Sequence, residues 1–129
     1  INHLRGKSNF SEIQKVISRV SKLAEKGRLK KTIFSHKDYI SPKLFEKECE
    51  NKVFEFIKQL EKIISLPNWN YFELFNSFEA NTNNLNELFD NDKGVLIMAE
   101  DAEIRNNRLN LLGLVRNYSL KIADFTKLN

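Results

Sequence analysis

The chain has 129 residues, of which 41% are hydrophobic and 29% are charged, and its net charge of +4 gives a pI of about 9.2. This length suits one domain with a single core, and this composition excludes a disordered polymer. A single cysteine excludes an internal disulfide, and one cysteine with two scattered histidines does not make a zinc site.

The first predicted helix runs from Asn9 to Gly27. Residues 1–8 precede it as a frayed entry, and Asn9 with Glu12 three positions later has the pattern of a capping box. The apolar positions that follow recur at helical spacing: Ile13, Val16, Ile17, Val20, Leu23 and Ala24. The start of the chain is unlike a signal peptide and no run approaches ~18 apolar residues, so we expect no membrane partner and a cytoplasmic location.

A second helix is predicted after a polar loop at residues 28–40. Ser41 suits the N-cap and Pro42 the first helical position, while a Leu-Pro-Asn sequence at 66–68 marks the end. Cys49 falls on the apolar face of this helix, so we expect a buried thiol rather than a nucleophile.

Three further helices are predicted in the second half of the chain. One begins near Asn70, a short one covers residues 83–89, and the last begins with Asp101 as its N-cap and continues to Asp124. The aromatic residues after Asn70 are expected to face the core: Tyr71, Phe72, Phe75 and Phe78. Residues 95–98 are apolar but too few to be assigned to a strand, a helix start or a packed loop. The predicted fold class is all-α, an antiparallel bundle of about four to five helices in one domain.

No motif of an independent catalytic site is present. The chain lacks a glycine-rich phosphate loop, a paired-histidine metal motif and a nucleophile elbow. Glu100 and Asp101 are adjacent, but neighbours along a chain do not converge on one substrate, and Asp101 is better explained as a helix cap. We therefore expect no catalytic or metal-binding residue in this chain.

Basic residues of the first helix form the main candidate binding surface. Four of them share a stripe roughly 60° wide, opposite the apolar face: Lys15, Arg19, Lys22 and Lys26. Arg28, Lys30 and Lys31 continue the basic sequence directly after this helix. Such a series can follow the phosphates of a nucleic acid, and the alternative is an ordinary solvated face in a lysine-rich chain. Trp69 and Tyr71 are candidates for stacking on unpaired bases, or else for packing at the rim of the core.

The arginines of the last helix have different predicted roles. Arg108 falls near the middle of the apolar face, where an arginine needs a partner, and we expect a carboxylate from residues 90–101 to supply it. Arg105 and Arg116 share one flank of the helix, from which either can reach RNA or solvent.

Short motifs follow one another in a definite order over residues 95–125. Val-Leu-Ile-Met at 95–98 is followed by Ala-Glu-Asp at 99–101, Arg-Asn-Asn-Arg-Leu at 105–109 and Ile-Ala-Asp-Phe at 122–125. This series closely resembles the C-terminal end of the β-subunit of the bacterial tetrameric glycyl-tRNA synthetase.

The resemblance extends from about residue 10 to the end of the chain. Residues 19–20 and 41–46 are similar to helix signatures of that family, and residues 112–117 look most like its cyanobacterial or plastid-related members. Two positions depart from the usual pattern, since Ser18 stands where many members have a basic residue and Lys22 where many have asparagine. If these positions touch the anticodon, the detailed contacts differ here.

The resemblance implies a DALR-type anticodon-binding fold in an excised C-terminal fragment of a larger subunit. It implies contact with the anticodon arm of glycine tRNA in support of the glycine–tRNA ligase reaction. The residues that we expect to contact RNA are Lys15, Arg19, Lys22, Lys26, Arg28, Arg105 and Arg116, while Asp101 and Arg108 are expected to be structural. The implied partners are the rest of the β-subunit and the catalytic α-subunit. ATP and Mg²⁺ are implied to bind elsewhere in the whole enzyme, and a eukaryotic source would imply a plastid location.

Two alternatives stay open from the sequence. One is the anticodon-binding domain of another synthetase, such as an arginyl type, which shares part of the 105–109 motif. The other is a helical module that docks only on protein, which predicts an exposed apolar patch and no RNA binding.

Overall fold

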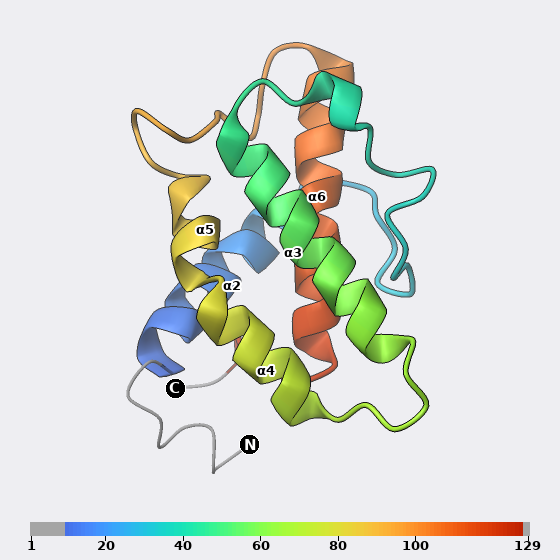
Figure 1. Ribbon diagram of the computed structural model, residues 1–129. Helices are drawn as coiled ribbons and strands as arrows, with labels where there is room; N and C mark the ends of the chain where they lie inside the picture. The colour runs from blue at the N-terminus through green and yellow to red at the C-terminus, as the bar shows by residue number, and fades with distance from the viewer. Residues whose placement is uncertain (1–9, 128–129) are drawn as a thin grey trace.

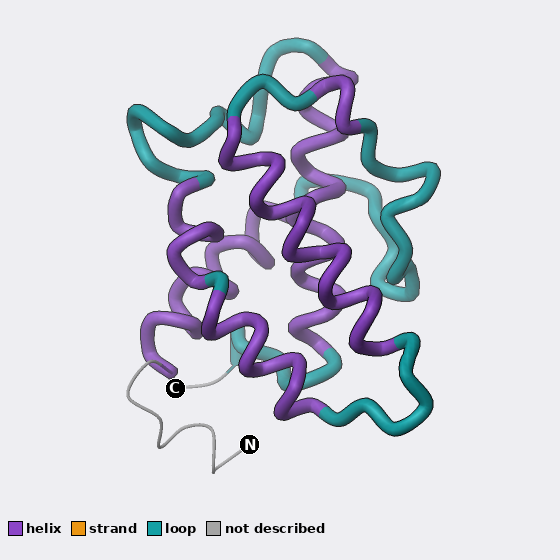
Figure 2. Tube along the Cα trace, in the orientation of Figure 1, coloured by secondary structure: helices purple, strands orange, loops and turns teal. Residues whose placement is uncertain are grey.

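Five α-helices and one 3₁₀ turn form the secondary structure of residues 10–127, the part of the chain that this computed structural model describes. In chain order they are α2 (Phe10–Ala24), the 3₁₀ turn η1 (Pro42–Leu44), α3 (Glu48–Ile64), α4 (Tyr71–Ala80), α5 (Thr82–Glu87) and α6 (Ala102–Leu120). Figure 2 shows only helix and loop over that range, which confirms the all-α fold class. The predicted cap at Asn9 and the predicted entry at residues 1–8 lie outside the described residues.

The direction of the helices is mixed, as Figure 1 shows. α3 and α6 run side by side in the same direction, whereas α2, α4 and α5 run the opposite way. The bundle is therefore antiparallel between α2 and α6, which share the most extensive helix–helix interface, and between α3 and α4. The two parallel helices arise because α4 and α5 carry the chain back before α6 begins.

α6 is the most extensively buried helix of the described residues, in contact with α2, α3 and η1. Its residues from Leu111 to Ser119 are all buried, and both apolar and polar side chains are among them. Because residues on every side of this segment are buried, α6 packs on more than one side.

The loop at residues 28–41 has no regular secondary structure, and side chains of α6 bind several of its backbone carbonyls. Three neighbouring side chains of α6 donate hydrogen bonds to its carbonyls: Arg116 Nη2 to Leu29 (2.9 Å), Asn117 Nδ2 to Lys30 (2.9 Å) and Ile33 (2.7 Å), and the Tyr118 hydroxyl to Phe34. Buried carbonyls need such partners when no helix or sheet supplies them. Gly113 permits the close approach, because a Cβ there would lie 2.8 Å from Leu29 Cδ2.

The second helix begins later than the sequence predicted. Ser41 makes no side-chain cap, and Pro42 opens only the 3₁₀ turn, so α3 starts at Glu48. The physical reason lies at Glu50, whose Oε1 accepts the backbone N–H of Lys47 at 3.1 Å and thereby caps the helix at that point. Ser41 is instead bound through its backbone by the amide of Asn107.

In the second half of the chain, some helix boundaries and side-chain orientations agree with the predictions and others differ. Asp101 caps α6 as predicted, because its side chain accepts the N–H of Ile104 at 3.0 Å. Phe75 and Phe78 face the core, but Tyr71 and Phe72 are exposed at 38% and 41%, so their inward placement was wrong. They stack on each other at the start of α4 with ring centroids 4.6 Å apart. Residues 95–98 are neither strand nor helix, and α6 ends at Leu120 rather than 124.

Candidate nucleic-acid interface

The outward face of α2 carries the basic residues that helical spacing brings together. Its inward face is buried, with Ile13, Ile17 and Val20 no more than 1% exposed. Three exposed cations occupy the opposite side and a fourth, Lys26, follows in the turn after Ala24; we call the four the α2 basic stripe: Lys15, Arg19, Lys22 and Lys26. The structure confirms that these side chains are exposed, and their contact with RNA stays a prediction.

None of the stripe residues forms an ion pair with a carboxylate within residues 10–127. The Arg19 guanidinium lies over the Phe89 ring, 4.2 Å from its centroid, which orders the side chain without neutralising it. Glu12 is exposed on the same helix, to one side of the stripe, and Glu25 is exposed in the turn just after the helix. The stripe therefore keeps its positive charge available to an anionic partner.

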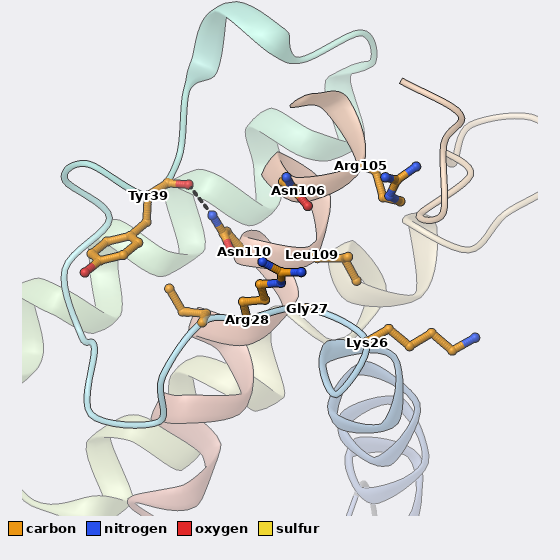
Figure 3. Close-up of a pocket in the computed structure, with 9 residues that line it drawn as sticks. Lys26, Gly27, Arg28, Tyr39, Arg105, Asn106, Leu109 and Asn110 are labelled. Carbon is orange, nitrogen blue, oxygen red and sulfur yellow. Dashed lines mark hydrogen bonds between the residues drawn. The ribbon is translucent and has the colours of Figure 1, made fainter. Parts of the chain in front are cut away.

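A hollow of about 490 Å³ lies where α2 ends and α6 begins. We call it the Arg28 groove, and Figure 3 shows its lining. Arg28 reaches across α6 in the middle of the view, with Tyr39 on one side and Lys26 and Arg105 on the other. The lining also includes Gly27 and Leu29, and Asn106, Leu109 and Asn110 of α6; it contains three cations and no acidic residue.

Hydrogen bonds to the backbone fix both sides of the Arg28 groove. Asn110 Nδ2 donates to the Tyr39 carbonyl at 2.7 Å and so places the loop that carries the tyrosine. On the other side, Arg105 Nη1 donates to the carbonyls of Ala99 at 3.0 Å and Glu100 at 3.2 Å. Arg105 is half-buried and forms no ion pair within residues 10–127, so it adds charge to a fixed surface.

Arg116 does not belong to this interface, which corrects its predicted role. It is only 6% exposed, and its guanidinium donates to the Leu29 carbonyl and to Asn117 Oδ1. Burial lowers the pKa of Arg116, while the nearby Glu25 raises it. Arg105 and Arg116 do lie on the same side of α6, but the 28–41 loop covers the part with Arg116 and leaves the part with Arg105 open.

Arg108 is structural, as expected, but its carboxylate partners come from a different segment. Its Nη2 lies 2.6 Å from Glu46 Oε1, and its Nε lies 3.6 Å from Oε2 of the fully buried Glu50. The segment at residues 90–101 supplies a backbone carbonyl instead, since Arg108 Nη1 donates to Leu96 at 2.8 Å. The prediction of a partner was correct, and the prediction of its source was wrong.

Trp69 and Tyr71 lie at the other end of α6 from the Arg28 groove. Trp69 is half-buried, and Lys121 Nζ, just after α6, lies 5.4 Å from its ring centroid. Tyr71 stacks on Phe72 and is exposed. These rings are not part of the surface that the stripe and the groove share.

The sequence analysis did not identify Tyr39, Asn106 or Asn110 as site residues. Tyr39 sits in a loop without periodicity, so no pattern marked it. Asn106 and Asn110 lie one helical turn apart and form part of one side of α6, which could be recognised only once the neighbouring loops were in place. The spacing of residues along the helix does not indicate which loop lies beside these two side chains.

A metal site, a reactive cysteine and a membrane-spanning helix have little support in the described part of the chain. Residues 10–127 contain no cluster of three His, Cys, Asp or Glu side chains that could bind a metal ion. Cys49 is buried as predicted, and this burial raises the pKa of its thiol. No helix within the same range is long and apolar enough to cross a membrane.

Comparison with known proteins gives one consistent group of relatives, although no family model matches. The chain is 33% identical over 124 residues to the glycine–tRNA ligase β subunit of Acaryochloris marina, an alignment that covers 95% of this chain and 17% of that subunit. It is 32% identical over 127 residues to the β subunits of Gloeothece citriformis and of Synechocystis, with 97% of this chain and 18% of each subunit aligned. The chain therefore corresponds to one segment of these ligase subunits and spans less than a fifth of their length.

Proposed function

We propose that this chain is the tRNA-binding domain of a glycine–tRNA ligase β subunit and contacts the anticodon arm of glycine tRNA. Two observations support the proposal. Nearly the whole chain aligns with a segment of such subunits, and the α2 basic stripe presents four exposed cations without a carboxylate partner in residues 10–127. The stripe is the observation that carries the RNA contact.

Phosphate contacts explain how such a stripe works. From Lys15 to Lys22 the helix rises about 10 Å, and Lys26 follows in the turn after Ala24, so the stripe spans a length over which a nucleic acid presents several phosphates. Each cation that neutralises a phosphate releases a counterion, so binding weakens as salt rises. Double-helical RNA is recognised mostly by its shape and RNA loops by their unpaired bases. The stripe therefore positions the RNA, and other groups contact its bases.

The wider assignment rests on the same relatives. We propose that the domain adopts the DALR-type fold and works with the rest of the β subunit and the catalytic α subunit. ATP and Mg²⁺ would then bind elsewhere in the whole ligase, and this domain would support aminoacylation by placing the tRNA. A cytoplasmic location, or a plastid one for a eukaryotic source, remains part of this proposal.

One observation favours the alternative of a protein-docking module. Leu96 is 71% exposed and Met98 is 39% exposed on the loop before α6. This small apolar patch fits a module that docks on protein, and that hypothesis predicts no binding of RNA even at low salt.

Fluorescence anisotropy of labelled glycine tRNA tests the proposal. We expect Lys15→Ala with Lys22→Ala to weaken binding and to lower the slope of log affinity against log salt by roughly 1–2, because each lost phosphate contact lowers it by roughly 1. The matched control is Lys43→Ala with Lys62→Ala, which removes the same charge from exposed lysines on η1 and α3. Equal effects of the two pairs would contradict the stripe, and no binding at low salt would favour the docking module.

A further inference from the structure

The Arg28 groove combines features that phosphate binding alone does not require. Three cations line it, but so do an aromatic ring and two amide side chains. Its volume of about 490 Å³ falls within the range of small-ligand sites, roughly 300–1,000 Å³. A surface that only followed phosphates would need neither a hollow nor groups able to distinguish one base from another.

The polar groups of the groove are free to bind a ligand. Among residues 10–127 the Asn106 amide forms no hydrogen bond, and Asn110 uses only its Nδ2, which leaves its Oδ1 free. Arg28 is exposed and forms no ion pair over the same range. These groups offer a donor and two acceptors beside a planar cation, which suits the hydrogen-bonding edge of a base.

Tyr39 supplies the aromatic surface. The residue is 39% exposed and lines the hollow, while its backbone carbonyl is bound by Asn110. An exposed ring on a fixed backbone loses little freedom when a base stacks on it. Across the groove, Lys26 belongs both to the lining and to the α2 basic stripe, so the two surfaces are continuous.

We propose that the Arg28 groove binds one unpaired nucleotide of the RNA that the stripe positions, and so builds on the function proposed above. The base lies against Tyr39 and Arg28 with its edge toward Asn106 and Asn110, and its phosphate faces Lys26 and Arg105. The stripe contributes affinity without regard to the base, whereas the groove contributes the part of the affinity that depends on a base being present. Trp69 and Tyr71, at the other end of α6, take no part in this contact.

The test compares two labelled stem–loop RNAs by fluorescence anisotropy. One carries the anticodon-arm sequence of glycine tRNA, and the other has the same stem with abasic residues throughout the loop. We expect the intact RNA to bind roughly tenfold more tightly, as stacking of one base on an aromatic ring implies. In Tyr39→Leu with Asn106→Ala this ratio should fall to about 1, while affinity for the abasic RNA and the salt slope stay unchanged, because neither change removes a charge.

Two variants make the outcomes distinguishable. Tyr71→Leu removes an exposed ring elsewhere and should keep the tenfold ratio, while Lys15→Ala with Lys22→Ala should lower the affinity for both RNAs and leave the ratio unchanged. Unchanged binding of the abasic RNA also shows that the groove variant is folded. Equal binding of both RNAs by the natural protein would overturn the nucleotide site and leave the stripe intact. Loss of the ratio in Tyr71→Leu would overturn the location, and no binding of either RNA would overturn both proposals.

Discussion

Replacing Arg108 with methionine tests whether the buried carboxylate of Glu50 depends on this arginine. Glu50 is fully buried, and its Oε1 accepts the backbone N–H groups of Glu46 at 2.9 Å and Lys47 at 3.1 Å. Its Oε2 has no hydrogen bond and lies 3.6 Å from Arg108 Nε. Methionine keeps most of the apolar stem of Arg108 and removes the charge that faces this oxygen.

The expected loss of stability follows from the burial of each group. Removing one member of a buried ion pair costs about 3–5 kcal/mol, because the other charge stays buried without compensation. The two backbone N–H groups still stabilise Glu50, so we expect Arg108→Met to cost about 3 kcal/mol. By contrast, the Glu46 side chain is 59% exposed, so Glu46→Gln should cost only about 0–1 kcal/mol.

Urea unfolding followed by circular dichroism measures these differences, provided that the dependence on urea stays constant between variants. A second variant, Arg108→Met with Glu50→Gln, keeps an acceptor for the backbone N–H groups and removes the buried charge. It should recover more than half of the loss. A loss under about 1 kcal/mol for Arg108→Met, or a double variant no more stable than the single one, would refute this reasoning.

Two further predictions concern a turn and a buried phenol. A Cβ at Gly94 would lie 2.4 Å from the Leu88 carbonyl oxygen and 2.5 Å from that of Asp90, so Gly94→Ala should cost more than about 2 kcal/mol in thermal unfolding. The neighbouring exposed change Lys93→Ala should stay within about 0.5 kcal/mol, and similar values for the two would contradict the steric argument. Burial, reinforced by Glu61, raises the pKa of Tyr118. The folded state therefore favours the neutral phenol, so its contribution to stability is complete below the ordinary pKa of about 10 and is lost as pH rises above it. The free energy of unfolding should thus fall more steeply between about pH 9 and 11 in the natural protein than in Tyr118→Phe, and parallel curves would count against this.

The stripe and the N-cap of α6 could be predicted because they depend on local spacing, whereas the cap predicted at Ser41 was wrong. Lys15 and Lys22 share an exposed face because a helix turns about 100° per residue and the apolar positions occupy the other side. Asp101 caps α6 because a carboxylate at that position reaches backbone N–H groups within the next turn. Neither result depends on which elements are neighbours in space.

The roles of the α6 arginines required knowledge of the packing. The sequence showed that Arg108 needed a partner but could not show that Glu46 and Glu50 would supply the charge. It placed Arg116 with Arg105, although the 28–41 loop buries one and leaves the other at the groove. The same loop, bound through its backbone carbonyls, brings Tyr39 to the groove without any local signal.

The helical class, the face of α2 that meets the core, the face that carries charge and the likeness to one ligase subunit could all be derived from the order of residues. These follow from the identity and spacing of residues along one helix or from order along the chain. Which cations remain free, which polar groups are used within the protein and where a hollow forms became known only from the folded chain. Those properties depend on contacts between segments far apart in the chain, because a side chain is buried or available only according to what packs over it.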